Sequence, residues 1–249
     1  MTTLDDVEAL IFDVFGTVVD WRGSVSRQLS QRHELPDHIL EDTATDWDAF
    51  TLEWRQGYYK HTRSVAEGGS GSTNIDIAHR QLLDAMLETP RWRHLSSHWD
   101  DKKREELARF WHNLDGWPDA TEGLYALKRH FIIGTLSNGS ARLLIDMAKH
   151  ADLPWDIIFS GDIIGSYKPN PKMYLGAAEK LDLPPTKVAM VASHIHDLRA
   201  AASHGIKTIY IRRSTEDTEF RDSIKPKADG GEVDLAVDSF VEIAKRFNR

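Results

Sequence analysis

Short, almost purely apolar runs recur along this chain and are separated by amphipathic stretches with a helical repeat. The runs are rich in β-branched and aromatic residues, and five stand out: 9–14 (ALIFDV), 131–137 (FIIGTLS), 155–160 (WDIIFS), 187–193 (KVAMVAS) and 207–212 (KTIYIR). Strands buried on both faces read as continuous apolar runs, and strands that alternate with helices pair in parallel. The pattern predicts an α/β fold with a doubly wound parallel sheet. We expect one more strand and helix after residues 212–232, which read as a solvated loop.

The interval between the first two runs breaks this alternation. It contains no convincing strand, but it has helical stretches such as 46–61 (DWDAFTLEWRQGYYKH) and 74–87 (NIDIAHRQLLDAML). We therefore expect two parts. Residues 1–19 and 115–249 should form the α/β core domain, and residues 20–114 should form an inserted helical cap domain.

Charge and composition exclude several classes of function. The net charge of -8 argues against a nucleic-acid or anionic-membrane partner, because no stripe of basic residues stands out to neutralise phosphates. The absence of cysteine rules out disulfides, thiolate catalysis and thiolate metal sites. No run approaches the ~18 apolar residues of a membrane-spanning helix, and the first ten residues lack the pattern of a secretory signal. We expect a cytoplasmic protein, and whether it forms a homodimer stays open.

Polar side chains follow the C-terminal ends of the predicted strands, where open parallel sheets bind their ligands. In chain order they are Asp13, Ser137, Asn138, Lys168, Tyr174, His194 and Asp197, and the apolar Phe15 stands two positions after Asp13. A lone acid after a buried strand either caps a turn or serves as a nucleophile in a dry pocket. The convergence of two carboxylates, a lysine, a hydroxyl and an imidazole on one rim favours the nucleophile.

These segments, in this order, resemble the haloacid dehalogenase superfamily. DVFGT (13–17) matches its nucleophile loop, LSNGS (136–140) its second motif, YKPNPKMY (167–174) its lysine motif and HIHD (194–197) its last motif. The resemblance covers essentially the whole chain. It implies a haloacid dehalogenase-like core with the helical insert as the cap.

Departures from the superfamily's phosphatase pattern indicate the branch. Phosphatases carry a second aspartate two positions after the nucleophile, where this chain has Phe15. The last motif has His194 and His196 instead of paired acids, so there are too few oxygen ligands for Mg²⁺. We therefore expect no metal and no cofactor.

The L-2-haloacid dehalogenase branch, often called type II, matches these departures. An aromatic residue at position 15 is characteristic of that branch, and so is the tripeptide Trp54-Arg55-Gln56 on the first cap helix. The last motif is similar to a sub-branch that includes enzymes able to break carbon–fluorine bonds. The resemblance implies hydrolytic dehalogenation of small 2-haloalkanoic acids, including fluoroacetate in that sub-branch, through an aspartyl ester.

The resemblance also implies roles for single residues. Asp13 would be the nucleophile and Lys168 would keep it ionised, while Asp197 and His194 would orient or deprotonate water. Asp197 or a backbone group would then hold the tautomer of His194. The substrate-binding side chains would be Phe15, Arg55, Ser137, Asn138 and Tyr174. Within that set, Arg55 and Asn138 would hold the halide, and the Ser137 hydroxyl with nearby backbone N–H groups would hold the substrate carboxylate.

Three alternatives remain open at this point. A metal-free relative could open another activated or strained carboxylic acid, such as a four-membered ring amino acid. A Mg²⁺-dependent phosphatase of small molecules fits less well. A binding protein that has lost turnover is opposed by the intact Asp13, Lys168 and Arg55.

Overall fold

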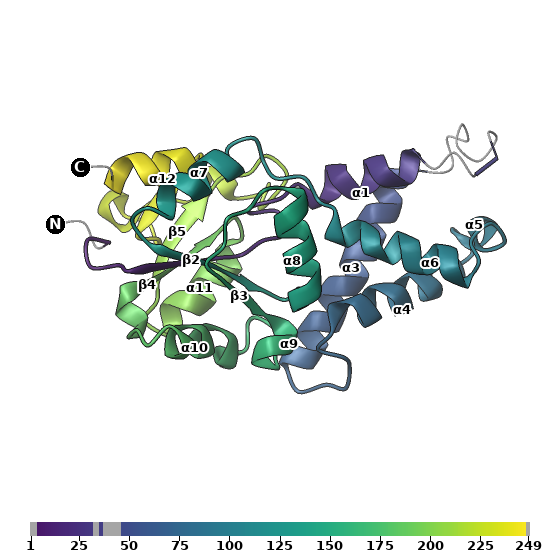
Figure 1. The fold of residues 1–249 in the computed structure, drawn as a ribbon, viewed down its shortest axis with the longest axis horizontal. Helices are drawn as coiled ribbons and strands as arrows, with labels where there is room; N and C mark the ends of the chain where they lie inside the picture. The colour runs from purple at the N-terminus through teal and green to yellow at the C-terminus, as the bar shows by residue number, and fades with distance from the viewer. Residues whose placement is uncertain (1–3, 32–34, 37–45, 248–249) are drawn as a thin grey trace.

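The computed structural model describes residues 4–31, 35–36 and 46–247, and a six-stranded parallel sheet forms its centre (Figure 1). The strands are β1 (Ala9–Phe12), β2 (Ile132–Ser137), β3 (Ile157–Ser160), β4 (Val188–Ala192), β5 (Lys207–Ile211) and β6 (Leu235–Val237). Their order is β3-β2-β1-β4-β5-β6, which is that of a doubly wound fold. Each of the five apolar runs contains a strand, and β6 follows residues 212–232. The predicted fold class is confirmed.

Most of the longer helices begin at a side chain that accepts a backbone N–H of the first turn. Asp20, Asp46, Asn74, Asp100 and Ser140 do this for α1, α3, α4, α6 and α8. The α-helices are α1 (Trp21–Ser30), α3 (Trp47–Ala66), α4 (Ile75–Leu87), α5 (Arg93–Ser96), α6 (Asp101–Ala108), α7 (Ala120–Leu127), α8 (Ala141–His150), α9 (Gly161–Ile164), α10 (Pro171–Lys180), α11 (Ile195–Ser203) and α12 (Phe240–Phe247). The 3-10 helices are η1 (Arg109–His112), η2 (Pro185–Lys187), η3 (Arg221–Ser223) and η4 (Lys227–Asp229).

Helices cover both faces of the sheet. Successive side chains of a strand point to opposite faces, so each strand contributes to both apolar layers. On β1, Leu10 and Phe12 belong to the apolar cluster that includes α7, α8 and α12. Ile11 belongs to the cluster on the other face, with α10 and α11 (Figure 1). All four residues of β1 are fully buried. The sheet therefore holds the end of β1 rigidly.

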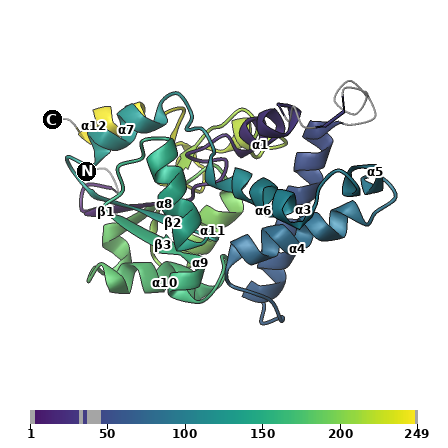
Figure 2. The ribbon, with the colours of Figure 1, turned by 45° about the vertical axis from the view of Figure 1, so that its right-hand side comes forward.

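The helical insert lies beyond one end of the sheet, where α3, α4, α5 and α6 pack together (Figures 1 and 2). Its centre is aromatic. The centre of the Phe50 ring lies 4.9 Å from that of Trp92 and 6.0 Å from those of Trp54 and Trp99. The chain leaves and re-enters the core at one place, where Asp20 N donates to Asp115 O at 2.9 Å. We propose that residues 20–114 act as the cap of a core made of residues 1–19 and 115–249.

The strand order changes direction between β1 and β4, and this places a crevice at their C-terminal ends. The helix after β2, α8, packs on one face, whereas the helix after β4, α11, packs on the other. Ligands of open α/β sheets bind in such a crevice. Among the described residues, no helix combines the length and the apolar character needed to cross a membrane.

Candidate active site

Asp13 directly follows β1 and is held at the crevice by both its backbone and its side chain. Its N–H donates to Val191 O of β4 at 3.0 Å. The Thr17 hydroxyl donates to Asp13 Oδ2 at 2.7 Å, and the same Thr17 oxygen accepts from Ser193 N at 2.9 Å. Gly16 makes this tight loop with φ of +87°, a conformation that glycine adopts without strain. The loops after β1 and β4 are therefore joined at the carboxylate.

A buried lysine bridges two carboxylates in this crevice. Lys168 Nζ donates to Asp13 Oδ1 at 2.7 Å and to Asp197 Oδ2 at 2.5 Å. Burial alone would raise the pKa of Asp13, but Lys168 and His194 outweigh it and hold that pKa far below its usual value. Burial would likewise lower the pKa of Lys168, whereas Asp13 and Asp197 raise it. Asp13 is thus an ionised carboxylate in a site almost closed to water.

His194 stands between two acids, and the second of them is not among the predicted site residues. His194 Nδ1 lies 3.1 Å from Asp13 Oδ2, and His194 Nε2 lies 2.8 Å from Glu216 Oε2. Burial would lower the pKa of the ring, but its contacts with Asp13 and Glu216 raise that pKa well above the usual value. In the free protein the ring is therefore a cation that donates to both carboxylates.

Two expectations for this part of the site are wrong. Residues 212–232 do not form a wholly solvated loop, because Glu216 is only 6% exposed. Asp197 does not hold the tautomer of His194, because its oxygens accept from Lys168 Nζ and from the Tyr174 hydroxyl, the latter at 2.5 Å. The sequence carries no signal that separates Glu216 from the other acids of this charged segment. Only the path of the loop after β5 brings it to His194.

Arg55 of α3 lies in an aromatic cage, and part of its guanidinium has no hydrogen-bond partner among the described residues. Its Cζ is 4.1 Å from the Tyr58 ring centre, 4.6 Å from that of Tyr59 and 4.8 Å from that of Phe15. Arg55 is 4% exposed, and neither Nε nor Nη1 has a hydrogen-bond partner in the described part of the chain. Buried donors normally have partners. The side chain is therefore suited to bind an anion.

One cavity of about 650 Å³ joins these groups, a size in the usual range of small-molecule sites. Of the nine predicted site residues, seven line it: Asp13, Arg55, Asn138, Lys168, Tyr174, His194 and Asp197. The other two, Phe15 and Ser137, are buried beside the site but do not line the cavity. Phe15 stacks on Arg55, and Ser137 Oγ accepts from Gly139 N at 3.1 Å.

The cavity has further walls that sequence reasoning did not assign to the site. Tyr58, Tyr59, Thr62 and Arg63 contribute the face formed by α3, and His196 contributes a ring next to His194. Burial and the neighbouring His194 lower the pKa of His196, which keeps its ring neutral. Within the described residues, no group of three or more histidine or acidic side chains is arranged to hold a metal ion.

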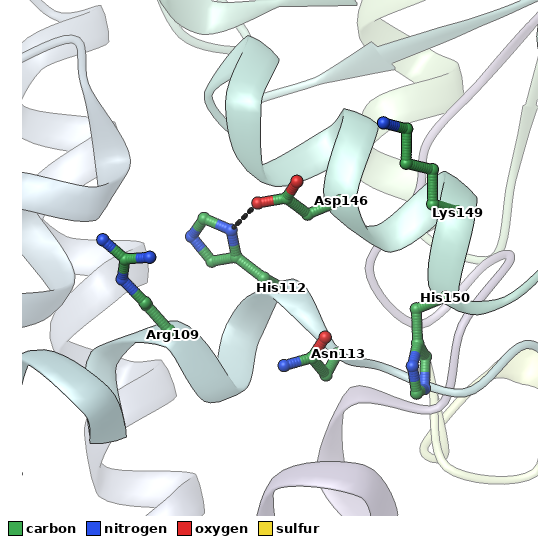
Figure 3. Close-up of a pocket in the computed structure, with 6 residues that line it drawn as sticks. All are labelled: Arg109, His112, Asn113, Asp146, Lys149 and His150. Carbon is green, nitrogen blue, oxygen red and sulfur yellow. Dashed lines mark hydrogen bonds and ion pairs between the residues drawn. The ribbon is translucent and has the colours of Figure 1, made fainter.

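A second hollow, of about 420 Å³, lies where η1 meets α8 and is lined by Arg109, His112, Asn113, Asp146, Lys149 and His150 (Figure 3). His112 Nδ1 lies 2.9 Å from Asp146 Oδ2, and its Nε2 lies 3.2 Å from Asp76 Oδ1 of α4. Burial would lower the pKa of His112, but Asp76 and Asp146 raise it. This cluster joins the insert to the core and has no nucleophile, so we interpret it as a stabilising contact.

Replacing His112 with glutamine should lower the free energy of unfolding by about 1–3 kcal/mol at about pH 5.5, because buried charge-assisted hydrogen bonds are lost. The folded pKa of His112 is raised, so its contribution is complete below its unfolded pKa of about 6.5 and is lost as the pH rises through the folded pKa. The deficit should therefore shrink at about pH 9. Urea unfolding at both pH values measures it.

His150→Gln is the matched control, because His150 pairs with Asp115 at a more exposed position. Exposed ion pairs contribute little to stability, so this variant should change the free energy of unfolding by less than about 1 kcal/mol at either pH. An equal deficit for His112→Gln at both pH values would show that the charge of His112 does not matter.

The chain is similar to proteins of known family over most of its length. The sequence model of the haloacid dehalogenase-like hydrolases matches residues 7–205. A Burkholderia cepacia relative, (S)-2-haloacid dehalogenase 4A, is 28% identical, and the match covers 87% of this chain and 88% of the relative. A solved structure described as a defluorinating L-2-haloacid dehalogenase is 35% identical, with a TM-score of 0.82 over 98% of this chain and 96% of that chain. Another L-2-haloacid dehalogenase is 34% identical with the same TM-score, over 96% of this chain and 99% of that chain.

Proposed function

The chain belongs to the haloacid dehalogenase-like hydrolases, and we propose that it hydrolyses the carbon–halogen bond of small 2-haloalkanoic acids. The observation that carries this proposal is a single cavity that holds an ionised nucleophile and a buried cation, two of whose nitrogens have no hydrogen-bond partner among the described residues. Asp13 is kept charged by Lys168, and Arg55 lines the same cavity with buried donors unsatisfied. A displacement that releases a halide needs both groups, and it needs no acid because a halide leaves without a proton.

In the first step, a carboxylate oxygen of Asp13 attacks the α-carbon of the substrate from the side opposite the halogen. An oxygen–carbon bond forms, the carbon–halogen bond breaks, and the halide departs with the bonding electrons. Arg55 stabilises the negative charge that develops on the halogen, because its guanidinium is already desolvated and in place. Thr17 and Lys168 orient the attacking carboxylate.

The substrate carboxylate needs donors on the opposite side of the cavity from Arg55. Asn138 Oδ1 accepts from Lys168 N at 2.7 Å, so the Asn138 amide group has its N–H donors left for a ligand. We assign Asn138 to this role together with backbone N–H groups of its loop, and no longer to the halide as the resemblance implied. The Ser137 hydroxyl, which was expected to hold the carboxylate, does not line the cavity. Phe15 and Ser137 support the site indirectly, through the Arg55 cage and the turn after β2.

In the second step, water attacks the carbonyl carbon of the Asp13 ester. The acyl–oxygen bond breaks, the 2-hydroxy acid leaves, and the Asp13 carboxylate forms again. After ester formation has removed the charge of Asp13 and His194 has lost its Nδ1 proton to solvent, His194 Nδ1 accepts a proton from the water; the short distance from Nδ1 to Asp13 Oδ2 supports this role. Over the whole cycle, one water is consumed and one halide and one proton are released.

The site also bears on the three alternatives. Phe15 offers no acid for the leaving alcohol of a phosphate ester. The intact set of Asp13, Lys168 and Arg55 opposes a protein that only binds. Opening of a strained ring amino acid would use the same displacement, and we keep it as the second candidate because Arg55 could equally hold another anion.

The proposed function is tested by measuring halide release from a panel of 2-chloro, 2-bromo and 2-fluoro acids, each with and without a chelator. We expect release that the chelator leaves unchanged, since Lys168 already provides a cation at both Asp13 and Asp197. Fluoroacetate belongs in the panel because one structural relative is described as defluorinating. Phosphatase activity that Mg²⁺ restores, or ring opening without halide release from any panel member, would overturn the proposal in favour of the corresponding alternative.

Replacing Arg55 with methionine should slow the single-turnover release of halide by about 100- to 1,000-fold, as the loss of one preorganised charge donor does in other sites. The reason is that, among the described residues, Arg55 is the cation within the aromatic cage, whereas Lys168 is already engaged with Asp13 and Asp197. A rapid-mixing assay with excess enzyme isolates this step. Arg91→Met is the control, because Arg91 also stacks on a tryptophan of the insert but does not line the cavity. An undiminished burst would remove Arg55 from the first step.

A further inference from the structure

Glu216 is an enclosed acid next to the nucleophile, and the two steps described above do not use it. It lies in the loop after β5, and both of its oxygens have partners. Oε2 faces His194 Nε2 at 2.8 Å, and Oε1 accepts from Trp21 Nε1 and from the Thr215 hydroxyl, each at 3.0 Å. A solvated surface acid would not be bound from three sides. The carboxylate therefore has one orientation, with Oε2 directed at the imidazole.

Contacts on both sides of Glu216 hold its loop against the loops that follow β1 and β4. Arg213 Nε donates to Thr17 O at 2.9 Å, and Ile195 N donates to Asp217 Oδ2 at 2.7 Å. Gly16 leaves the space that Glu216 occupies, because a Cβ at position 16 would lie 2.6 Å from Glu216 Cδ. The acid is thus placed by groups that also place Asp13 and His194.

Asp197, which lines the cavity, is not available to hold the imidazole of His194. Lys168 and the Tyr174 hydroxyl take its two oxygens, each at 2.5 Å. Burial would raise the pKa of Glu216, but His194 lowers it, so the acid stays charged. Asp13, Tyr59 and Glu216 act directly on His194. The other titratable or charged groups that line the cavity beside it are Arg55, Tyr58, Arg63, Lys168, Tyr174, His196 and Asp197.

We propose that Glu216 is the positioning residue of the second step: it holds the proton of His194 on Nε2, so that Nδ1 is free to accept the proton of the hydrolytic water. This inference rests on the proposed function and assigns a role to a residue outside the motifs. It gives the two acids different partners: Asp197 lines the cavity and pairs with Lys168, whereas Glu216 lies behind His194 and pairs with its ring.

The proton balance of the cycle follows from this arrangement. In the free protein, Nδ1–H of the imidazolium faces the Asp13 carboxylate and Nε2–H faces Glu216. Alkylation of Asp13 removes the negative charge at Nδ1, and the Nδ1 proton leaves to solvent. Water then adds to the ester carbon and gives one proton to Nδ1. The expelled alkoxide takes that proton from Nδ1 and leaves as the hydroxy acid. The second proton of the water, now on the Asp13 carboxyl, then moves to Nδ1 and restores the imidazolium and the carboxylate.

The charge of Glu216 also sets the pH dependence of ester hydrolysis. In the ester form, hydrolysis requires loss of the Nδ1 proton, so its rate should rise with pH through one ionisation. A negative neighbour stabilises the imidazolium. Removing the charge of Glu216 should therefore move this ionisation to lower pH, while the loss of the held tautomer lowers the limiting rate.

Glu216→Gln tests the proposal because it keeps the size of the side chain and removes its charge. Single-turnover halide release should stay within about 3-fold of wild type, whereas ester hydrolysis should slow by about 100-fold or more, as expected when a base loses its correct tautomer. The ester on Asp13 should accumulate in the mass spectrum. The ionisation that controls hydrolysis should move by more than about one pH unit to the acid side.

Glu216→Asp and Glu219→Gln complete the design. Glu216→Asp keeps the charge at a longer distance, so hydrolysis should slow while its ionisation stays near the wild-type position; this variant also serves if Glu216→Gln does not fold. Glu219→Gln removes an exposed acid of the same loop and should behave as wild type.

Three results would overturn the role of Glu216: ester hydrolysis at the wild-type rate in the Glu216 variants, an equal loss in both steps, or an unmoved ionisation in Glu216→Gln. A failure of the proposed function looks different, because the wild-type protein itself would then release no halide and form no ester.

Discussion

Replacing Asp13 with asparagine should lower halide release by about 10⁴- to 10⁶-fold, the range seen when a catalytic nucleophile is removed. An amide oxygen is a far weaker nucleophile than the carboxylate that Lys168 keeps ionised. The variant should still fold, because asparagine has the same shape and its oxygen still accepts from Lys168. Halide release under single-turnover conditions measures the loss, since every later step depends on this attack.

Isotope labelling distinguishes a nucleophile from a residue that only binds. After one turnover of the wild-type protein in heavy-oxygen water, the label should appear in the peptide that contains Asp13 and not in the hydroxy acid. Asp182→Asn is the matched control for the variant, because Asp182 lies in a turn after α10, remote from the cavity, with φ of +55°, which asparagine tolerates. Label in the product after the first turnover would mean that water attacks the substrate directly.

Replacing His194 with alanine should stop the cycle after the first step. Asp13 keeps its contacts with Thr17 and Lys168, so the ester should still form. Its hydrolysis should slow by about 100- to 10,000-fold, which is the usual contribution of a general base. The expected result is a single burst of halide and a protein that is heavier by the acyl fragment in the mass spectrum.

The control for this variant is His98→Ala, which removes an exposed histidine of the insert and should leave both steps unchanged. If His194→Ala turns over at the wild-type rate, His194 is not the base. If it shows no adduct because the first step has failed, His194 acts on the nucleophile instead. In either case, Asp197 becomes the candidate for activating the water.

Much of the fold was predictable because its signals are local. A strand buried on both faces must be apolar along its whole length, so each run of such residues marked a strand to within a few positions. The polar residue after each run then had to lie at one edge of the sheet, because parallel strands end on the same side. Asp13, Asn138, Lys168 and His194 were found in this way, and all four line the cavity.

The sequence by itself also indicated the branch, through Phe15 and through Arg55 in its tripeptide. It did not indicate why two guanidinium nitrogens of Arg55 have no hydrogen-bond partner among the described residues. That depends on a cage assembled from α3 and from the loop after β1, which meet only when the insert packs over the strand ends. Tyr58 and Tyr59 lie three and four residues after Arg55 on the same helix, a spacing that the sequence shows. Only the packing of the insert, however, brings the Phe15 ring to Arg55.

Tertiary structure alone decided the partner of His194. The tautomer was expected to depend on Asp197 or a backbone group, three residues away at most, but the ring faces Glu216, which is 22 positions further along the chain. Burial of a charge is favourable only where counter-charges and hydrogen bonds surround it. Residues from the loops after β1, β4 and β5 provide these around Glu216. Local sequence can place an acid in a loop, but only the packing of three loops determines whether that acid faces water or a catalytic imidazole.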